Sequence, residues 1–213
     1  MTNICIETDF RRFVYLADFG YNFGMRKFII LSIILLNCLG CIAGSSELSK
    51  QATTFYSDNN QVKTMDLILQ INEKDRKAQD WLLLGNVMAD SLKMEDAAYM
   101  YKKAIEKDKK CYRAYYNLGN YYFDHGRFAE ALENYSKAYK LSPENPYICY
   151  NLGCAALKLG DLNKAKLYFY KAVMFDSNVP EFHYNLAYVY KKLNKEKLAQ
   201  PYLDNYNKLM ENR

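Results

Sequence analysis

The chain has 213 residues, of which half are hydrophobic and a quarter charged, which is the balance of an ordinary folded protein. Only four prolines and nine glycines interrupt it, and this scarcity favours helices over a turn-rich β-protein. The formal charge of +5 is spread along the chain, with acids near lysine pairs such as Lys109-Lys110. Because no long basic stripe is present, the composition argues against nucleic-acid binding.

Six cysteines are scattered over the sequence and predict no disulfide framework. Cys149 and Cys154 are five residues apart on a predicted helix, so they point in different directions and are too far apart to bridge. We expect these two and Cys111 to serve as small apolar side chains. No metal-ligand cluster or cofactor motif is found in the sequence, and no cofactor is expected.

An apolar segment near the start predicts export. Met25-Arg26-Lys27 precedes nine residues without charge, 28–36, which are followed by Asn37-Cys38-Leu39-Gly40-Cys41. A basic stretch, an apolar core and a small-residue exit are typical of a secretory signal peptide. The run is short for a membrane span, which needs about 20 apolar residues. The segment resembles a bacterial lipoprotein signal, in which the cysteine after the apolar core is acylated.

The resemblance to a lipoprotein signal leaves two cysteines open as the acylated residue. Cys41 follows the preferred small residue Gly40, whereas Cys38 follows Asn37. We favour Cys41, with Cys38 as the alternative, and an uncleaved signal anchor is a further alternative. Either form predicts an exported, membrane-anchored protein of the bacterial cell envelope.

Three further predictions concern the segments on either side of the signal, which comprises residues 25–41. Residues 1–24 carry three acidic side chains and several aromatics, so we interpret them as a non-native extension and place the start of translation at Met25. Residues 42–60 are polar and are expected to form a flexible tether. Apolar side chains within 61–77 predict an amphipathic capping helix that covers the segment from residue 78 onward.

A motif with a period of 34 residues predicts the fold. Tyr-Asn-Leu-Gly recurs at 116–119 and 150–153, with Tyr-Asn-Leu-Ala at 184–187 and Leu-Leu-Leu-Gly at 82–85. The spacing defines the frames 78–111, 112–145, 146–179 and 180–213. These frames resemble the tetratricopeptide repeat, W-x2-L-G-x2-Y followed by A-x3-F and P. The second frame matches best, with Tyr115, Leu118, Gly119, Tyr122, Ala131, Tyr135, Ala138 and Pro143.

The resemblance implies an all-α fold of tandem helix-turn-helix repeats that form a short right-handed α-solenoid. Gly119 and Ala131 are small because the two helices of a repeat cross closely there. One repeat cannot bury its own apolar face, so neighbouring repeats must stack. Pro201 falls inside the last predicted helix, and we expect it to kink or shorten that helix.

In this family the first helix of each repeat lines a concave groove. A primary amide can pair with both halves of a peptide unit, so a row of asparagines there is expected to hold an extended partner segment. Lys158, Lys191 and Lys192 would make one end of the groove basic and suit an acidic partner. The alternative is that the asparagines and tyrosines of this row are ordinary repeat residues without a role in binding, kept alike by duplication. The predicted peptide-groove residues are Asn86, Tyr116, Asn117, Asn120, Tyr150, Asn151, Tyr184 and Asn185.

The sequence therefore predicts a membrane-tethered scaffold that binds a protein or peptide partner, with envelope assembly as its setting. An enzyme is not expected. The sequence has two histidines, His125 and His183, but no pairing of a nucleophile with a base and no phosphate-binding loop. The alternative function is self-association into homo-oligomers through an uncapped C-terminal end.

Overall fold

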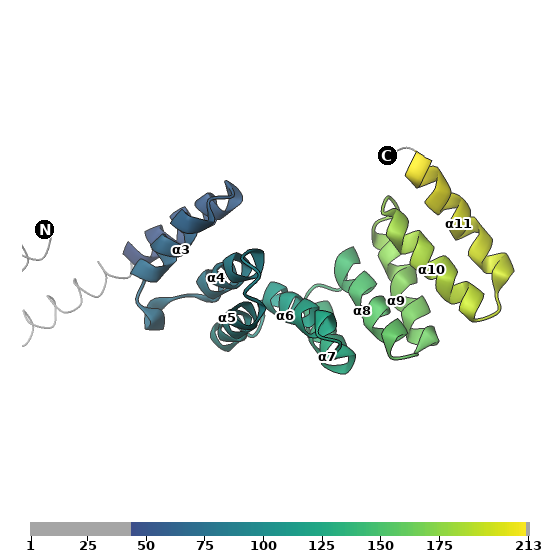
Figure 1. The fold of residues 1–213 in the computed structure, drawn as a ribbon, viewed down its shortest axis with the longest axis horizontal. Helices are drawn as coiled ribbons and strands as arrows, with labels where there is room; N and C mark the ends of the chain where they lie inside the picture. The colour runs from purple at the N-terminus through teal and green to yellow at the C-terminus, as the bar shows by residue number, and fades with distance from the viewer. Residues whose placement is uncertain (1–43, 212–213) are drawn as a thin grey trace, which may run out of the picture.

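The computed structural model describes residues 44–211 as a row of antiparallel helix pairs (Figure 1). The predictions for residues 1–43, including the signal peptide, Cys38 and Cys41, lie outside the described residues. Residues 44–211 contain helices and no strand, so the prediction of an all-α tandem repeat fold is confirmed. None of these helices is long and apolar enough to cross a bilayer.

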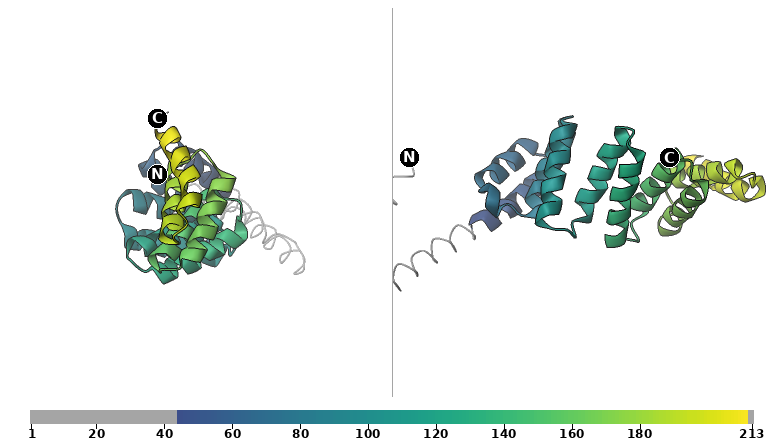
Figure 2. Two further views of the ribbon diagram at one scale, coloured as in Figure 1. Left: turned by 90° about the vertical axis from the view of Figure 1, so that its right-hand side faces the viewer. Right: turned by 90° about the horizontal axis from the view of Figure 1, so that it is seen from below.

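The helices pair in chain order, and Figure 2 shows the pairs stacking along the long axis of the molecule. The first helix of each of the last four pairs begins at residue 78, 112, 146 or 180, which are also the first residues of the four frames. The elements are a helix over 44–57, α3 Gln61–Gln70, a 3-10 turn Glu73–Asp75, α4 Ala78–Asp90, α5 Met94–Lys107, α6 Tyr112–Asp124, α7 Phe128–Leu141, α8 Pro146–Lys158, α9 Leu162–Phe175, α10 Pro180–Lys192 and α11 Glu196–Glu211.

One residue in the left-handed backbone region turns the chain between the two helices of each of these pairs. Gly126, Gly160 and Asn194 have φ angles of 71°, 80° and 58°, which glycine and asparagine adopt readily. Leu92 takes the equivalent position in the first frame with φ 60°. A leucine pays roughly 1–2 kcal/mol for this conformation, and its side chain is 81% exposed, so packing returns little of that cost.

The two helices of a repeat cross where a glycine faces an aromatic ring. A Cβ atom on any of the three glycines would lie 2.5–2.6 Å from ring carbons, closer than atoms can pack. In the last repeat leucine replaces the aromatic ring and alanine replaces the glycine. Among the four repeats, glycine is therefore found where an aromatic ring faces it. The pairs are Gly85 with Tyr101, Gly119 with Tyr135 and Gly153 with Phe169, and the last-repeat equivalents are Ala187 and Leu203.

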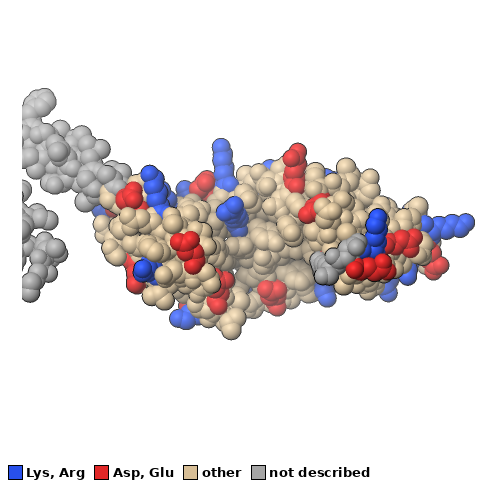
Figure 3. All heavy atoms as spheres, turned by 90° about the horizontal axis from the view of Figure 1, so that it is seen from above, with Lys and Arg blue, Asp and Glu red and all other residues tan. Residues whose placement is uncertain are grey.

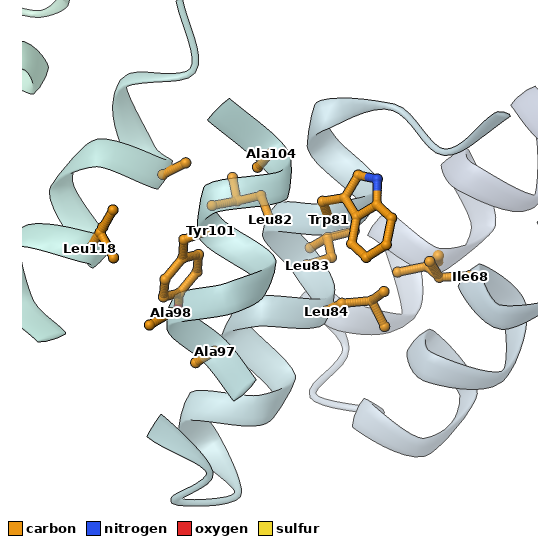
Figure 4. Close-up of a cluster of buried hydrophobic side chains, with 12 residues drawn as sticks. Ile68, Trp81, Leu82, Leu83, Leu84, Ala97, Ala98, Tyr101, Ala104 and Leu118 are labelled. Atoms are coloured by element: carbon orange, nitrogen blue, oxygen red, sulfur yellow. The ribbon is translucent and has the colours of Figure 1, made fainter. Parts of the chain in front are cut away.

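The core is continuous between neighbouring helix pairs. In Figure 4, Trp81 and Leu84 of α4 point toward Ile68 of α3, while Tyr101 of α5 lies on the side of Leu118 of α6. All five side chains are at most 5% exposed. Each pair therefore depends on the next for burial of its apolar face, as stacked repeats do.

The two helices before residue 78 form a further hairpin, of which the sequence predicted only the second: α3 lies within the capping segment expected over 61–77, and its Ile68 packs with Trp81 and Leu84. The flexible tether expected over 42–60 is wrong for residues 44–57, which are helical and bury Ala52 completely. Ser49 of this helix donates a hydrogen bond to the buried carboxylate of Asp80 in α4. Four buried residues lie 33 positions before core residues of the first frame: Ala52, Thr64, Ile68 and Ile71 precede Gly85, Ala97, Tyr101 and Ala104. The hairpin thus takes the place of an additional repeat.

The last helix, α11, differs from the second helices of the other repeats on its outer face. Tyr206 and Asn207 take positions held by buried alanines and half-buried apolar residues in the other repeats. These are Ala104, Ala138 and Ala172, and Ile105, Tyr139 and Val173. The Tyr206 ring packs on Tyr184 of α10 with centroids 5.3 Å apart, and Asn207 leaves an exposed amide where the other repeats have an apolar residue; a polar group on the stacking side is the pattern of a terminal repeat.

Pro201 does not shorten α11, so that part of the expectation is wrong. The helix has 16 residues and continues through the proline. Because Pro201 lies one and a half turns into the helix, its missing N–H removes a single bond, to the carbonyl of Lys197. The exposed side chain of Pro201 also leaves the core untouched.

Candidate peptide-binding groove

The first helices of the four repeats, α4, α6, α8 and α10, share one face of the row. In Figure 1, α4 lies above α5 and α6 above α7. Figure 3 views the molecule from above, and a broad area in its middle carries few charged side chains. All eight predicted groove residues are on these helices; Tyr184 is exposed and the other seven are half-buried.

The asparagines of this face connect neighbouring repeats. Asn117 Nδ2 donates to Asn86 Oδ1 at 2.9 Å, and Asn151 Nδ2 donates to Asn120 Oδ1 at 3.0 Å. We call these two amide–amide bonds the amide ladder. Each joins the first helix of one repeat to the first helix of the next, so the amides contribute to the stacking of repeats.

Tyrosine hydroxyls continue the same network. Asn151 Nδ2 also donates to the Tyr116 hydroxyl at 3.1 Å. Asn185 Nδ2 donates to the Tyr150 hydroxyl at 3.1 Å and to its own helix at the Glu181 carbonyl. Burial raises the pKa of Tyr116 and Tyr150 above the ordinary value of 10.0, so both hydroxyls stay neutral and able to accept these bonds at physiological pH.

The carbonyl oxygens of the amide ladder each accept a second hydrogen bond from the second helix of their own repeat. The Tyr101 hydroxyl donates to Asn86 Oδ1 at 3.1 Å, and the Tyr135 hydroxyl donates to Asn120 Oδ1 at 2.8 Å. In the third repeat the equivalent residues are Phe169 and Cys154. Donor and acceptor are replaced together there, because a buried hydroxyl without an acceptor costs about 1–3 kcal/mol.

These contacts limit what the asparagine row can offer a partner. With two hydrogen bonds each, the carbonyl oxygens of Asn86 and Asn120 are engaged within the protein. The row also holds aromatic rings against the second helices. Tyr116 packs on Tyr135 with ring centroids 5.9 Å apart, and Tyr184 packs on Tyr206 at 5.3 Å.

A cavity of about 310 Å³ opens between α4, α6 and α8. Three predicted groove residues line it, together with five that the sequence analysis did not select: Asn86, Tyr116 and Asn117, and Leu82, Tyr112, Arg113, Asn145 and Tyr147. Arg113 supplies the one positive charge of this lining. The Tyr112 hydroxyl, which accepts a hydrogen bond from Arg113 Nε at 3.3 Å, raises the pKa of the guanidinium further.

Three tyrosines of α8 and α10 expose their rings. Tyr147, Tyr184 and Tyr188 are 52%, 48% and 39% exposed, and we call them the aromatic patch. Tyr184 and Tyr188 are four residues apart and share one face of α10. Two of these tyrosines could be noticed in the sequence, because Tyr147 stands where the preceding frame has Arg113 and Tyr188 where it has Cys154. An alignment of the repeats shows these differences as ordinary substitutions.

The C-terminal end of this face is basic. Lys158, Lys191 and Lys192 are exposed, and within residues 44–211 none of them forms a salt bridge. Lys192 Nζ lies 5.5 Å from the centroid of the Tyr188 ring, an attractive cation–π geometry. The ammonium group of Lys192 therefore borders the aromatic patch.

The described residues hold no group of three or more side chains suited to a metal ion. Burial raises the pKa of the Cys149 and Cys154 thiols to about 11, so both are protonated at neutral pH. His183 is buried, with Nε2 2.9 Å from the Ser177 carbonyl. It fills the position that tryptophan takes in the first frame, and its neighbours supply no reacting partner.

Comparison with known families decides the identity of the fold. A model described as the Tetratricopeptide repeat protein 21 C-terminal ARM domain matches residues 36–166, more than half of the chain. A tetratricopeptide repeat model matches residues 180–209. The chain belongs to the tetratricopeptide repeat family. No sequence among the curated proteins matches it.

Solved structures with a similar fold support this assignment. MamA AMB-1 superposes with a TM-score of 0.68 at 17% identity, over 79% of this chain and 93% of that one. The pilF protein of Pseudomonas aeruginosa superposes with a TM-score of 0.67 at 22% identity, over 79% of this chain and 78% of that one. At these identities the likeness concerns the fold alone. Tetratricopeptide repeats are protein-interaction modules, and this chain is a scaffold of that class.

Proposed function

We propose that this tetratricopeptide repeat protein is a non-catalytic adaptor that holds an extended segment of a partner on the face formed by α4, α6, α8 and α10. The cavity of about 310 Å³ between the first helices carries this proposal. It lies on the predicted groove face, and its lining combines aromatic rings, amides and the guanidinium of Arg113, a set that binds both the apolar and the polar parts of a peptide.

The energy of binding comes mainly from the rings. A net hydrogen bond contributes about 0.5–1.5 kcal/mol, whereas micromolar affinity needs about 8 kcal/mol. The carbonyls of Asn86 and Asn120 are engaged internally, so hydrogen bonds to the remaining amide groups alone fall short of this value. The exposed area of Tyr147, Tyr184 and Tyr188 supplies the apolar contact that makes up the difference.

Partner capture from envelope extracts tests this function. A variant with Arg113→Ala and Tyr147→Ala alters the exposed rim of the cavity and leaves the amide ladder intact. Its matched control is Tyr99→Ala with Tyr170→Ala, two rings on second helices that are 53% and 44% exposed. We expect the rim variant to lose the partner while the control keeps it, with unchanged helical circular dichroism. Equal capture by both variants refutes the groove.

We also propose that the protein is exported and tethered to a membrane of the bacterial envelope through a lipid on Cys41, with Cys38 as the alternative. The basic stretch and apolar core before these cysteines support export. The chain is already helical at residue 44, three positions after Cys41, so such an anchor would hold the repeats close to the bilayer. Labelling with radioactive palmitate tests this: loss of label in Cys41→Ala supports Cys41, and undiminished label assigns another residue.

Self-association through the C-terminal end is the less favoured function. Tyr206 and Asn207 on the outer face of α11 replace the small and apolar residues on which repeats stack. Light scattering separates the two functions, because an adaptor keeps the mass of a monomer as its concentration rises. Met210, near the end of α11, is 44% exposed. A mass that grows with concentration, and falls again on replacement of Met210 by a charged residue, would favour assembly.

A further inference from the structure

We propose that the solvent-facing side of α9 docks on a bilayer that contains anionic lipid, so that the folded repeats themselves touch the membrane. This surface lies on a second helix and is not part of the groove, so the inference goes beyond the adaptor function. It rests on the proposed location at a membrane, but not on which cysteine carries the lipid.

Three large apolar side chains form a stripe along α9 that faces solvent. Leu167, Tyr170 and Met174 are 49%, 44% and 64% exposed. Their spacing of three and four residues places them on one side of the helix, and we call them the α9 stripe. Ala165 and Phe169 lie on the opposite side and are completely buried. The stripe is therefore additional to the apolar face that α9 needs for its own packing.

The second helices of the other repeats carry charged side chains where α9 carries the stripe. Each of them has two charged residues among the three positions, as a solvated surface requires. The equivalent residues are Tyr99, Lys102 and Glu106 in α5, Glu133, Ser136 and Lys140 in α7, and Pro201, Asp204 and Lys208 in α11. The stacking of repeats thus does not account for the stripe, and a contiguous exposed apolar patch of this kind is typical of an interaction surface.

Lysines flank the α9 stripe on both sides. With 3.6 residues per turn, Lys166 lies on one side of the stripe, and Lys164 and Lys171 lie on the other. Lys164 Nζ is 3.3 Å from the carboxylate of Asp161 at the start of the helix. Lys171 Nζ lies 4.9 Å from the centroid of the Tyr139 ring of α7. The ammonium groups are thus held at the edges of the stripe and leave its centre apolar.

The net charge of α9 is positive, unlike that of the other second helices. It has three lysines and no acidic residue, whereas α5 and α7 balance every lysine with an acid and α11 has one acid more than it has lysines. The neighbouring acids are engaged: Glu133 of α7 pairs with Lys137 at 2.6 Å, and Asp204 of α11 accepts from Gln200 at 2.8 Å. An anionic surface is therefore attracted to α9.

These features favour a lipid surface over a second copy of the chain. Two copies that met through the α9 stripe would bring their lysines together, and like charges repel. Three side chains that are about half exposed also offer only roughly 300 Å², against about 800 Å² per partner in a stable protein interface. A bilayer has neither limit, because apolar side chains enter its interface while lysine stems extend toward the headgroups.

This contact would also orient the groove. In Figure 1, α9 lies between α8 and α10, and its buried Phe169 packs in one cluster with Ala156 of α8 and Leu186 of α10. The first helices are thus on the side of α9 that faces away from the stripe. A bilayer beneath the stripe leaves the face of the first helices open to solvent, where a partner can reach it.

Tryptophan quenching by brominated lipid tests the contact on the full chain reconstituted into vesicles. The one native tryptophan, Trp81, is buried and gives a constant background. Tyr170→Trp places a reporter in the stripe, while Tyr99→Trp on α5 and Tyr188→Trp on α10 are controls at exposed rings. In vesicles of phosphatidylglycerol and brominated phosphatidylcholine, we expect the Tyr170→Trp emission to shift to the blue and to be quenched. Both controls should keep their emission.

Apolar variants in the Tyr170→Trp chain test the stripe. Leu167→Ser with Met174→Ser is expected to abolish the quenching. The matched control is Val62→Ser with Leu69→Ser, two side chains of α3 that are also seven residues apart and are 68% and 55% exposed, and it should leave the quenching unchanged. All four side chains are exposed, so circular dichroism is expected to show an unchanged fold.

Charge variants test the requirement for anionic lipid. Lys164→Gln with Lys166→Gln is expected to lower the ratio of docked to undocked chain about fivefold per lysine, the equivalent of about 1 kcal/mol each. The control pair Lys102→Gln with Lys140→Gln, on α5 and α7, should have little effect. Vesicles of phosphatidylcholine alone should quench the Tyr170→Trp chain less than those with phosphatidylglycerol.

The outcomes separate this inference from the proposals above. If Tyr170→Trp keeps its emission in vesicles that hold the chain, or if Tyr99→Trp and Tyr188→Trp are quenched equally, the inference is wrong, while palmitate labelling and partner capture still decide the anchor and the adaptor. If Leu167→Ser with Met174→Ser lowers the mass of the chain in detergent, the stripe joins copies of the chain and the inference is also wrong. If the chain does not float with vesicles at all, the membrane location and this inference fall together.

Discussion

Replacing Gly119 by alanine is expected to destabilise this protein, although the same change in an unobstructed helix is stabilising. Alanine is preferred over glycine inside a helix by about 1 kcal/mol. Here, however, the new Cβ would lie 2.5 Å from Cδ1 and Cε1 of Tyr135. That ring is 1% exposed, and its hydroxyl is fixed on Asn120 at 2.8 Å, so it cannot move aside without breaking another contact.

The magnitude follows from the difference between these two effects. Overpacking in a well-ordered core costs about 1–3 kcal/mol, and a fully buried ring with a fixed hydroxyl places this site in the upper part of the range. Subtracting the gain of about 1 kcal/mol from helix propensity leaves a loss of about 1–2 kcal/mol. For a chain of this size the melting temperature would fall by about 2–4 °C per kcal/mol.

Thermal and urea unfolding followed by circular dichroism measure the loss, and the last repeat supplies the rescue. Ala187 and Leu203 occupy the two equivalent positions there, so Tyr135→Leu should make room for the methyl group that Gly119→Ala introduces. We expect a coupling of about 2 kcal/mol between the two substitutions in a double-mutant cycle. A Gly119→Ala protein as stable as wild type, or additive effects in the cycle, would refute the reasoning.

Three further outcomes are expected from features described above. Leu92→Gly is expected to stabilise the fold by about 1 kcal/mol in urea unfolding, because it relieves a left-handed leucine that buries little; destabilisation would mean that the exposed leucine has packing we do not see. Tyr135→Phe is expected to cost about 1 kcal/mol by removing one of the two bonds to Asn120. Because burial raises the pKa of Cys149 and Cys154 from 9.0 to about 11, their contribution to stability is complete below pH 9 and is lost as pH rises through 11. A variant with both cysteines changed to alanine should show a smaller loss over that range, and an unchanged slope would exclude the thiols as its cause.

The repeat fold was readable from the sequence because four copies of one motif keep the same spacing. The small residue and the large ring of each helix crossing stand at fixed positions, as with Gly119 and Tyr135. The helix over 44–57, and its pairing with α3 as a repeat-like hairpin, were missed because the spacing to the first frame is 33 residues and the hairpin lacks the glycine and the tyrosine of the motif. Ala52 and Ile68 take their places, and neither residue is distinctive without the structure.

The groove was only partly predictable. The 34-residue period places Asn117, Asn151 and Asn185 on the expected helices, but the bonds that their amides make between repeats join residues 31 or 35 apart, such as Asn86 with Asn117 and Tyr150 with Asn185. Neither separation is visible when repeats are aligned in register. The exposure of Tyr147 likewise depends on how α8 sits beside its neighbours, which no single frame reveals.

The asparagine bonds of the first helices are not shared equally among the junctions between repeats. Asn151 makes two hydrogen bonds across the junction between the second and third repeats. Asn117 and Asn185 make one each across the junctions on either side. The junction between the second and third repeats is therefore held by one more asparagine hydrogen bond than the junctions on either side of it. Replacement of Asn151 is accordingly expected to weaken the coupling between neighbouring repeats more than replacement of Asn117 or Asn185.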